Sequence, residues 1–160
     1  MLNWFRKCIW CDNDANKIVI SRRCIAKLVR YAREYSPCEC GSWLSGKYLS
    51  GKTCVILDIA KVPCDSTHGR GSFCRGVAGF ESVGDNFVGE WHTHPGGTGL
   101  PSRTDDVTME RLRGCHLRGC TSPIMIILSG AMRGEGDVNI YIYHRDGRRV
   151  EFMRQRRING

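Results

Sequence analysis

The chain has 160 residues, of which 41% are hydrophobic and 25% charged, and its formal net charge is +8. This length and composition are typical of one globular domain and exclude a disordered or fibrous protein. No apolar run approaches the roughly 20 residues of a membrane span, and Arg6 and Lys7 stand where a secretory signal would be apolar. We therefore expect one domain over residues 1–160 that is cytoplasmic and binds no membrane.

The hydrophobic pattern predicts strands and helices mixed along one core. Residues 1–16 show no regular pattern and are expected to form an N-terminal extension, and residues 154–160 a basic tail. Between them the pattern predicts, in chain order, a strand at 17–20, a helix from the Ser21 cap to Ser36-Pro37, strands at 40–49 and 54–60, a loop or insertion at 64–84, a strand at 87–92, a helix at 104–112, and strands at 123–129, 138–144 and 150–153. This order predicts an α/β or α+β fold.

Ten cysteines raise the question of structural zinc. Cys8 and Cys11 form a C-x-x-C pair and Cys38 and Cys40 a C-x-C pair, but neither has the turn chemistry of a zinc knuckle. We expect reduced thiols in a cytosolic protein instead.

Arginines gather near the end of the chain. A basic tail can bind nucleic acid or an acidic partner, but only Phe152 interleaves these arginines, so no stacking platform is indicated. We expect a solvated face and no main role in nucleic-acid binding. The arginines are Arg145, Arg148, Arg149, Arg154, Arg156 and Arg157.

Two histidines give the first sign of catalytic chemistry. His92 and His94 stand at positions i and i+2 at the end of a predicted strand, so both side chains point to the same face and Thr93 to the other. Two imidazoles on one face can both reach one zinc ion, with bonds of about 2.0–2.1 Å.

A third ligand is expected from the helix that follows. Asp105 lies in its first turn, after a loop whose glycines and prolines let the helix start fold back toward the strand end. Two histidines and a carboxylate leave a zinc position open for water, whose pKa the metal lowers to around 7. Ser102 stands three residues before Asp105, where its hydroxyl can face the metal. A second interpretation is that Ser102 and Asp105 cap the helix, and we expect both roles together only if Asp105 turns outward.

The string His92-x-His94-Pro95, then Ser102-x-x-Asp105, resembles the motif of the JAMM family of metallo-isopeptidases, also called MPN+ or JAB. The family's upstream glutamate resembles Glu39, which opens a Glu-x-Gly-x-x-Leu-x-Gly pattern here. The resemblance implies one catalytic zinc ion on His92, His94 and Asp105, with Glu39 as general base and Ser102 as oxyanion donor. Glu90 is the alternative base, since on a strand it shares the face of His92.

The resemblance also implies a fold and a function. The fold is the MPN fold, a mixed, mainly antiparallel sheet flanked by helices and related to cytidine deaminases. The segment Gly-Glu-Trp-His-Thr-His-Pro looks most like small prokaryotic JAB proteins, which occur with ubiquitin-like conjugation enzymes in antiphage operons, including CBASS. The implied activity is hydrolysis of the amide bond after the C-terminus of a ubiquitin-like protein or of a conjugated target. Implied partners are that protein, its conjugates and the activating and conjugating enzymes.

Two other functions stay open from the sequence. One is a non-catalytic MPN scaffold, although such proteins usually lack the metal ligands. The other is a nucleic-acid-associated protein similar to the DNA-repair branch of the JAB family, which shares the His-x-His-Pro loop. Residues 64–84 are our candidate for a partner-binding insertion. The remaining histidines show no ligand spacing and are interpreted as structural or surface residues: His68, His116 and His144.

Overall fold

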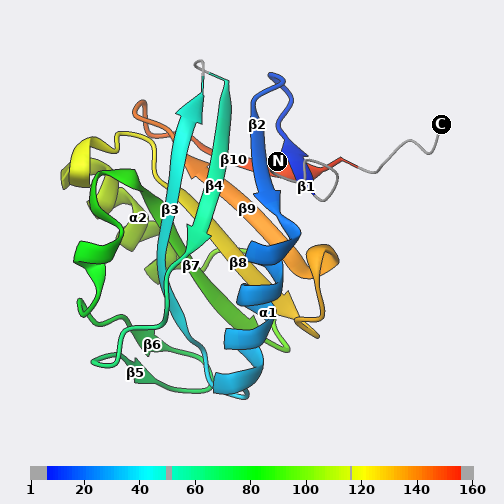
Figure 1. The fold of residues 1–160 in the computed structure, drawn as a ribbon, viewed down its shortest axis with the longest axis vertical. Coiled ribbons are helices and arrows are strands. Elements are labelled where there is room, and N and C mark those ends of the chain that lie inside the picture. Colours follow the sequence, from blue (N-terminus) through cyan, green and yellow to red (C-terminus); the bar gives the residue numbers. More distant parts are fainter. Residues whose placement is uncertain (1–6, 50–51, 116, 156–160) are drawn as a thin grey trace.

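The computed structural model describes residues 7–49, 52–115 and 117–155. One sheet dominates these residues, with two helices against it (Figure 1). Its strands are β1 (Lys7–Cys11), β2 (Lys17–Ser21), β3 (Gly41–Leu49), β4 (Thr53–Ile59), β7 (Phe87–Pro95), β8 (Ile124–Gly130), β9 (Val138–Tyr143) and β10 (Arg149–Arg154). The helices are α1 (Arg22–Tyr35) and α2 (Arg103–Cys115), and β5 (Thr67–His68) with β6 (Phe73–Cys74) forms a separate two-stranded sheet.

The main sheet closes on itself in the order β1-β10-β9-β8-β7-β3-β4-β2, because β1 pairs with both β2 and β10. The pairs β2–β4 and β7–β8 are parallel and the others antiparallel, which confirms a mixed, mainly antiparallel sheet. Closure leaves none of these eight strands as an edge of the main sheet. The described residues contain no helix long and apolar enough to cross a membrane.

The inner face of the closed sheet and α1 share the main core. Alternate residues of β8, such as Ile124, Ile126 and Leu128, point inward and are fully buried. The helix α1 adds Leu28 and Tyr31 to the same cluster. Ser21 caps α1 as predicted, since its hydroxyl accepts a hydrogen bond from the Cys24 N–H at 3.1 Å.

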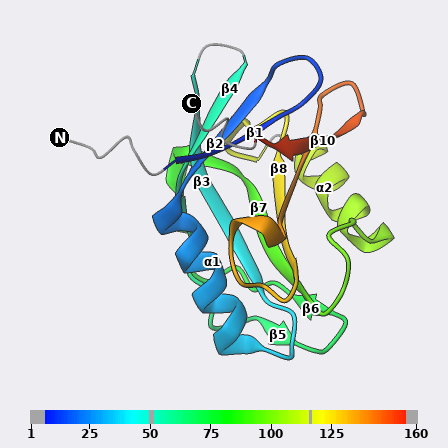
Figure 2. The same cartoon turned by 90° about the vertical axis from the view of Figure 1, so that its right-hand side faces the viewer.

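The helix α2 covers the outer face of the same strands. Met109 of α2 packs with Met125 and Ile127 of β8 and with Tyr141 of β9, and all four are fully or almost fully buried. The two helices therefore lie on opposite sides of the sheet (Figure 2). Because β8 is covered on both faces, its sequence is one continuous apolar run, as the pattern of residues 123–129 predicted.

The prediction of an N-terminal extension over residues 1–16 is wrong from residue 7 onward, and residues 1–6 lie outside the described part. Residues 7–11 are strand β1, which closes the sheet, and Trp10 lies in the core with 1% of its surface exposed. The sequence pattern does not indicate this strand, because it has only five residues and is stabilised by pairing with β2 and with the distant β10.

Two further boundaries differ from the prediction. Arg154 belongs to β10 and pairs with Glu135, so the predicted basic tail does not begin there, and residues 156–160 lie outside the described part. Residues 64–84 are not all loop, because they include β5, β6 and a short 3-10 helix at Phe80–Ser82. The expected kinship with cytidine deaminases stays a prediction.

The closing strand gives a test of this architecture. Trp10→Ala should lower the free energy of unfolding by about 3–5 kcal/mol, because it leaves a large cavity in the core. Urea unfolding measures the loss. Met153→Ala is the matched control on the neighbouring β10, where the side chain is 65% exposed; its effect should stay within about 0.5 kcal/mol. Equal effects of the two changes would contradict a structural role for β1.

Candidate metal centre

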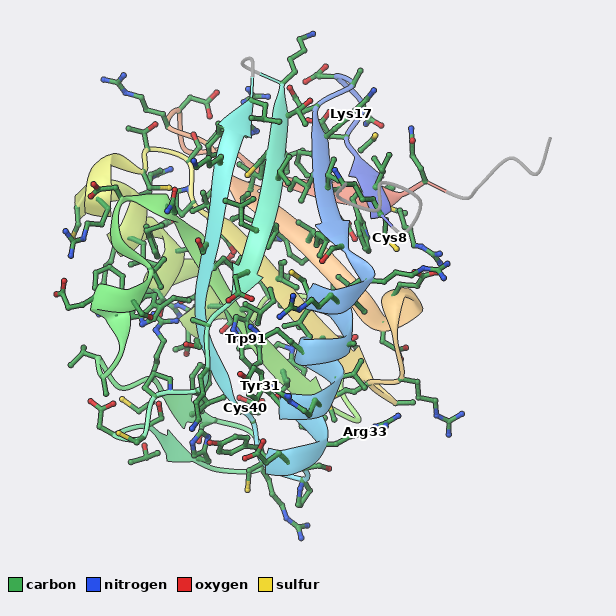
Figure 3. The ribbon with its side chains drawn as sticks, viewed as in Figure 1. Cys8, Lys17, Tyr31, Arg33, Cys40 and Trp91 are labelled. Atoms are coloured by element: carbon green, nitrogen blue, oxygen red, sulfur yellow. The ribbon has the colours of Figure 1, made fainter. Side chains whose placement is uncertain are left out.

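Strand β7 presents His92 and His94 on one face, as the period of a strand predicts. Their Nε2 atoms lie 3.2 Å apart. Trp91 and Thr93 point to the opposite face, where Trp91 stacks on Tyr31 of α1 with ring centroids 5.7 Å apart (Figure 3). Thr93 accepts a hydrogen bond from the Cys40 N–H at 3.0 Å. Opposite faces of one strand thus serve the core and the site.

Asp105 reaches the two histidines from the first turn of α2. Its Oδ1 lies 3.3 Å from Nε2 of His92, and its Oδ2 lies 3.6 Å from Nε2 of His94. Ligand atoms of these three residues all lie within 4.8 Å of one another, so the structure brings the predicted set together. In the part of the chain that the structure describes, this is the one group of three such side chains.

The loop between β7 and α2 is fixed against the sheet. The Tyr141 hydroxyl donates a hydrogen bond to the carbonyl of Gly99 at 2.9 Å. A side chain at Gly99 would meet Asn139, whose atoms lie as near as 2.1 Å to the position of a Cβ. This close docking determines where α2 begins and therefore where Asp105 lies.

Ser102 and Asp105 form a reciprocal cap at the start of α2. The Asp105 N–H donates to Oγ of Ser102 at 3.2 Å, and the Ser102 N–H donates to Oδ2 of Asp105 at 2.6 Å. Our expectation that the two roles can occur together only if Asp105 turns outward is wrong, because the same carboxylate caps the helix and faces both histidines. A carboxylate has enough lone pairs for both roles.

The donor set fits a zinc ion. Two imidazole nitrogens and one carboxylate oxygen are ligands that zinc takes, and three protein ligands are typical of a catalytic site. His94 is oriented for this role, since its Nδ1 lies 3.0 Å from the carbonyl of Thr98 and its Nε2 points toward Asp105. A hydrogen bond from Nδ1–H to a carbonyl leaves Nε2 as the ligand atom.

Electrostatics couple the three side chains. Burial raises the pKa of Asp105, but hydrogen bonds from His92 and His94 outweigh it and hold that pKa well below its usual range. The hydrogen bond to Asp105 raises the pKa of His94 in turn, against the opposing effect of burial. Asp105 therefore stays ionised beside the histidines and can neutralise part of the charge of a cation.

Glu39 lies two residues before β3, and its backbone is held from two sides. Its N–H donates to the carbonyl of Gly69 at 2.8 Å, and its carbonyl lies 2.8 Å from Nδ1 of His68. His68 thus has a structural contact, as predicted, while His116 lies outside the described residues. Burial raises the pKa of Glu39, whereas His94 and His92 lower it, so the Glu39 carboxyl lies within electrostatic range of the ligands.

The Glu-x-Gly pattern has a steric cause. A Cβ at Gly41 would lie 2.5 Å from the carbonyl oxygen of Trp91 and 2.8 Å from the Cβ of His92. Only glycine lets β3 approach β7 this closely, two residues after Glu39. The pattern therefore marks the position where β3 meets the histidine strand.

Glu90, the alternative base, has different neighbours. It is 3% exposed, forms an ion pair with Arg75, and places Oε1 3.7 Å from Nδ1 of His92. Glu90 therefore lies on the Nδ1 side of the His92 ring, whereas Asp105 and His94 lie on its Nε2 side. Arg75 belongs to the segment predicted as loop, and no local sequence pattern marks its contact with Glu90.

A cleft of about 690 Å³ opens beside the ligand set. Glu39, His94, Ser102 and Asp105 line it together, and Glu90 also borders it. Residues 70–75 form its other wall. The predicted base, metal ligand and hydroxyl donor thus share one opening that a substrate can enter.

Comparison with known proteins agrees with this geometry. Residues 21–141 match the family described as prokaryotic homologs of the JAB domain. The chain is 36% identical over 125 residues to a CD-NTase/cGAS isopeptidase of Enterobacter hormaechei, and the match covers 73% of this chain and 69% of that protein.

Two solved structures are similar. A protein from Desulfitobacterium hafniense matches with a TM-score of 0.54 and 17% identity, over 82% of this chain and 87% of that one, which shows a shared fold. A JAB1/MPN domain protein from Archaeoglobus fulgidus matches with a TM-score of 0.45 and 18% identity, over 82% and 93% of the two chains. The family match spans most of the chain and includes Glu39 and the whole His92–Asp105 segment. The chain therefore belongs to the prokaryotic branch of the JAB family, as its sequence predicted.

Proposed function

We propose that the chain is a zinc-dependent isopeptidase that hydrolyses the amide bond after the C-terminus of a ubiquitin-like protein or of a conjugated target. The observation that carries this proposal is the convergence of His92, His94 and Asp105 within 4.8 Å, beside a cleft that His94, Asp105 and Glu39 line. The relative from Enterobacter, which is named an isopeptidase, supports it. We place the activity in a bacterial antiphage conjugation pathway.

His92, His94 and Asp105 would hold the zinc ion. When bound, zinc would supply a Lewis acid and lower the pKa of a water molecule in its open position. Asp105 would contribute negative charge, and its cap on α2 would keep it in place during turnover. This arrangement assigns the ligands without any contribution from the cysteines.

Glu39 would act as general base. Its carboxylate would accept a proton from the attacking water and return it to the nitrogen of the leaving amine. Ser102 would donate its hydroxyl hydrogen to the oxygen of the scissile carbonyl as negative charge develops there. That hydrogen is available because Oγ of Ser102 acts as acceptor toward the Asp105 N–H.

The tail of the substrate would enter along the wall formed by residues 70–75. The main sheet is closed, so among the described strands the small β5–β6 sheet provides the edge to which an extended peptide can add. This edge lies beside Glu39, since Gly69 and His68 contact its backbone. Residues 64–84 would also contact the folded body of the partner, with Val77 74% exposed there.

The observed ion pairs weigh against a nucleic-acid function. Arg148 pairs with Asp146, Arg149 with Asp106, and Arg154 with Glu135. Three of the arginines that suggested a basic surface thus have carboxylate partners within the chain. A non-catalytic scaffold is the weaker alternative, because it would not require a complete ligand set beside a cleft.

Metal content provides the first test. Purified protein should contain one zinc per chain and cleave a linear fusion that places a tagged protein after a ubiquitin-like C-terminus. A chelator should abolish cleavage and added zinc restore it. His92→Ala should lose the metal by elemental analysis, whereas His144→Ala, which borders a different cavity, should keep it. Zinc retained by His92→Ala would point to the cysteines as ligands.

Glu39→Gln separates catalysis from metal binding. Loss of a general base typically costs about 10²–10⁴ in rate, so kcat should fall by that factor while zinc stays stoichiometric. Steady-state cleavage of the same fusion measures the change, and Glu34→Gln on the exposed surface of α1 is the control. Full activity in Glu39→Gln would transfer the role of base to Glu90.

Val77→Asp tests the partner surface. A buried charge at a docking surface should raise KM for a folded ubiquitin-like fusion by about tenfold, or about 1.4 kcal/mol, and leave kcat unchanged. Leu57→Asp is the matched control, because Leu57 is also exposed, at 49%, but lies on β4. If KM is unchanged in Val77→Asp, the partner does not dock on this part of the segment.

A further inference from the structure

His92 lies between two carboxylates. Its Nε2 faces Asp105, whereas its Nδ1 is buried and has no hydrogen-bond partner among the residues that the structure describes. The nearest carboxylate to Nδ1 is that of Glu90, whose Oε1 lies 3.7 Å away. This separation is longer than the roughly 2.7–2.9 Å of a charge-assisted hydrogen bond, but it places an acceptor beside the unsatisfied nitrogen.

The other oxygen of Glu90 is already engaged. Its Oε2 accepts a hydrogen bond from Arg75, whose guanidinium lies 3.8 Å from the centroid of the Trp43 ring. Trp43 on β3 is the direct cross-strand neighbour of Glu90 on β7. The side chains of Arg75 and Glu90 are 11% and 3% exposed, so they form a largely buried ion pair that packs against the ring of Trp43.

Hydrogen bonds and close packing around Asp65 fix the backbone that follows Arg75. The carboxylate of Asp65 accepts hydrogen bonds from the N–H groups of Val77 and Ala78 at 3.0 and 3.1 Å. A Cβ at Gly76 would lie 1.9 Å from Oδ1 of Asp65, so the loop packs tightly at the residue after Arg75. Arg75 is therefore presented to Glu90 from a fixed backbone.

We propose that Glu90 is a positioning residue for the metal, and that Arg75 acts through it. Glu90 accepts the Nδ1–H of His92, so that His92 keeps the tautomer in which Nε2 is the ligand atom. Arg75 holds the second oxygen of Glu90 and so sets the direction of the first. Carboxylates in this role are known to orient metal-bound histidines in general. The inference rests on the metal site of the proposed function and gives Glu90 a role other than that of base.

Zinc affinity, measured without substrate by competition with a chromophoric chelator, tests this assignment in the full chain. Glu90→Gln should weaken zinc binding by roughly 10–100-fold, the usual cost of losing such a partner. Arg75→Met should weaken it by less. The double variant Arg75→Met with Glu90→Gln should match Glu90→Gln within about twofold, because Arg75 acts only through Glu90. Arg33→Met, which changes an exposed arginine of α1 outside the cleft, is the control and should bind zinc like the wild type.

The double variant also guards against misfolding, since it removes both buried charges and leaves neither without its partner. The visible absorption bands of the cobalt-substituted protein add a second readout, because they should shift in Glu90→Gln and stay unchanged in Arg33→Met. Wild-type zinc affinity in Glu90→Gln or in the double variant would overturn the inference. So would losses in the two single variants that multiply in the double variant.

The outcome is separate from that of the proposed function. If Glu90→Gln binds zinc like the wild type but loses turnover, Glu90 is the base and the positioning role is wrong, while the isopeptidase stands. If Glu90→Gln weakens zinc binding but no ubiquitin-like fusion is cleaved by the wild type, the positioning role stands and the proposed function fails.

Discussion

The site depends on one carboxylate that satisfies two demands. Asp105 caps the first turn of α2 through the Ser102 N–H and faces the Nε2 atoms of His92 and His94. The start of the helix and the two histidines are therefore linked, because moving Asp105 away would remove a capping contact as well as a ligand. Ser102 is the N-cap residue of this capping box, and such a residue is worth about 0.5–2 kcal/mol. The stability of α2 and the geometry of the candidate metal centre are thus coupled through a single side chain.

The two faces of strand β7 have different roles, one in the core and one in the candidate metal centre. Trp91 and Thr93 face α1 and the start of β3, where they are completely buried. Glu90, His92 and His94 face the other way, toward α2 and residues 70–75. Because successive residues of a strand alternate between faces, a shift of register by one residue would exchange the two sets. Pairing with β3 and β8 on both sides fixes the register and therefore the site.

The sequence predicted those features that depend on neighbouring residues. The alternation of β7 predicted the shared face of His92 and His94, and a cap before a helix predicted the position of Asp105. Glu39 was found only through the family pattern, because it is distant in sequence and meets the histidines through the β3–β7 pairing. The strand β1 and the contact of Arg75 with Glu90 could not be found, since each forms only when distant segments have folded together. Whether Glu39 and Ser102 do the chemistry assigned to them stays a prediction.

Residues 67–75 contact three residues of the candidate site, Glu39, His92 and Glu90. Gly69 holds the backbone of Glu39, Phe73 packs on the ring of His92 with centroids 6.0 Å apart, and Arg75 pairs with Glu90. A partner that binds this segment would therefore touch residues that already support the base and a metal ligand. Deleting the segment would disturb the base and the metal ligand at once. A loss of activity in that variant would therefore not separate partner docking from support of the site. An exposed side chain such as Val77, which has none of these contacts, separates recognition from the support of the metal centre.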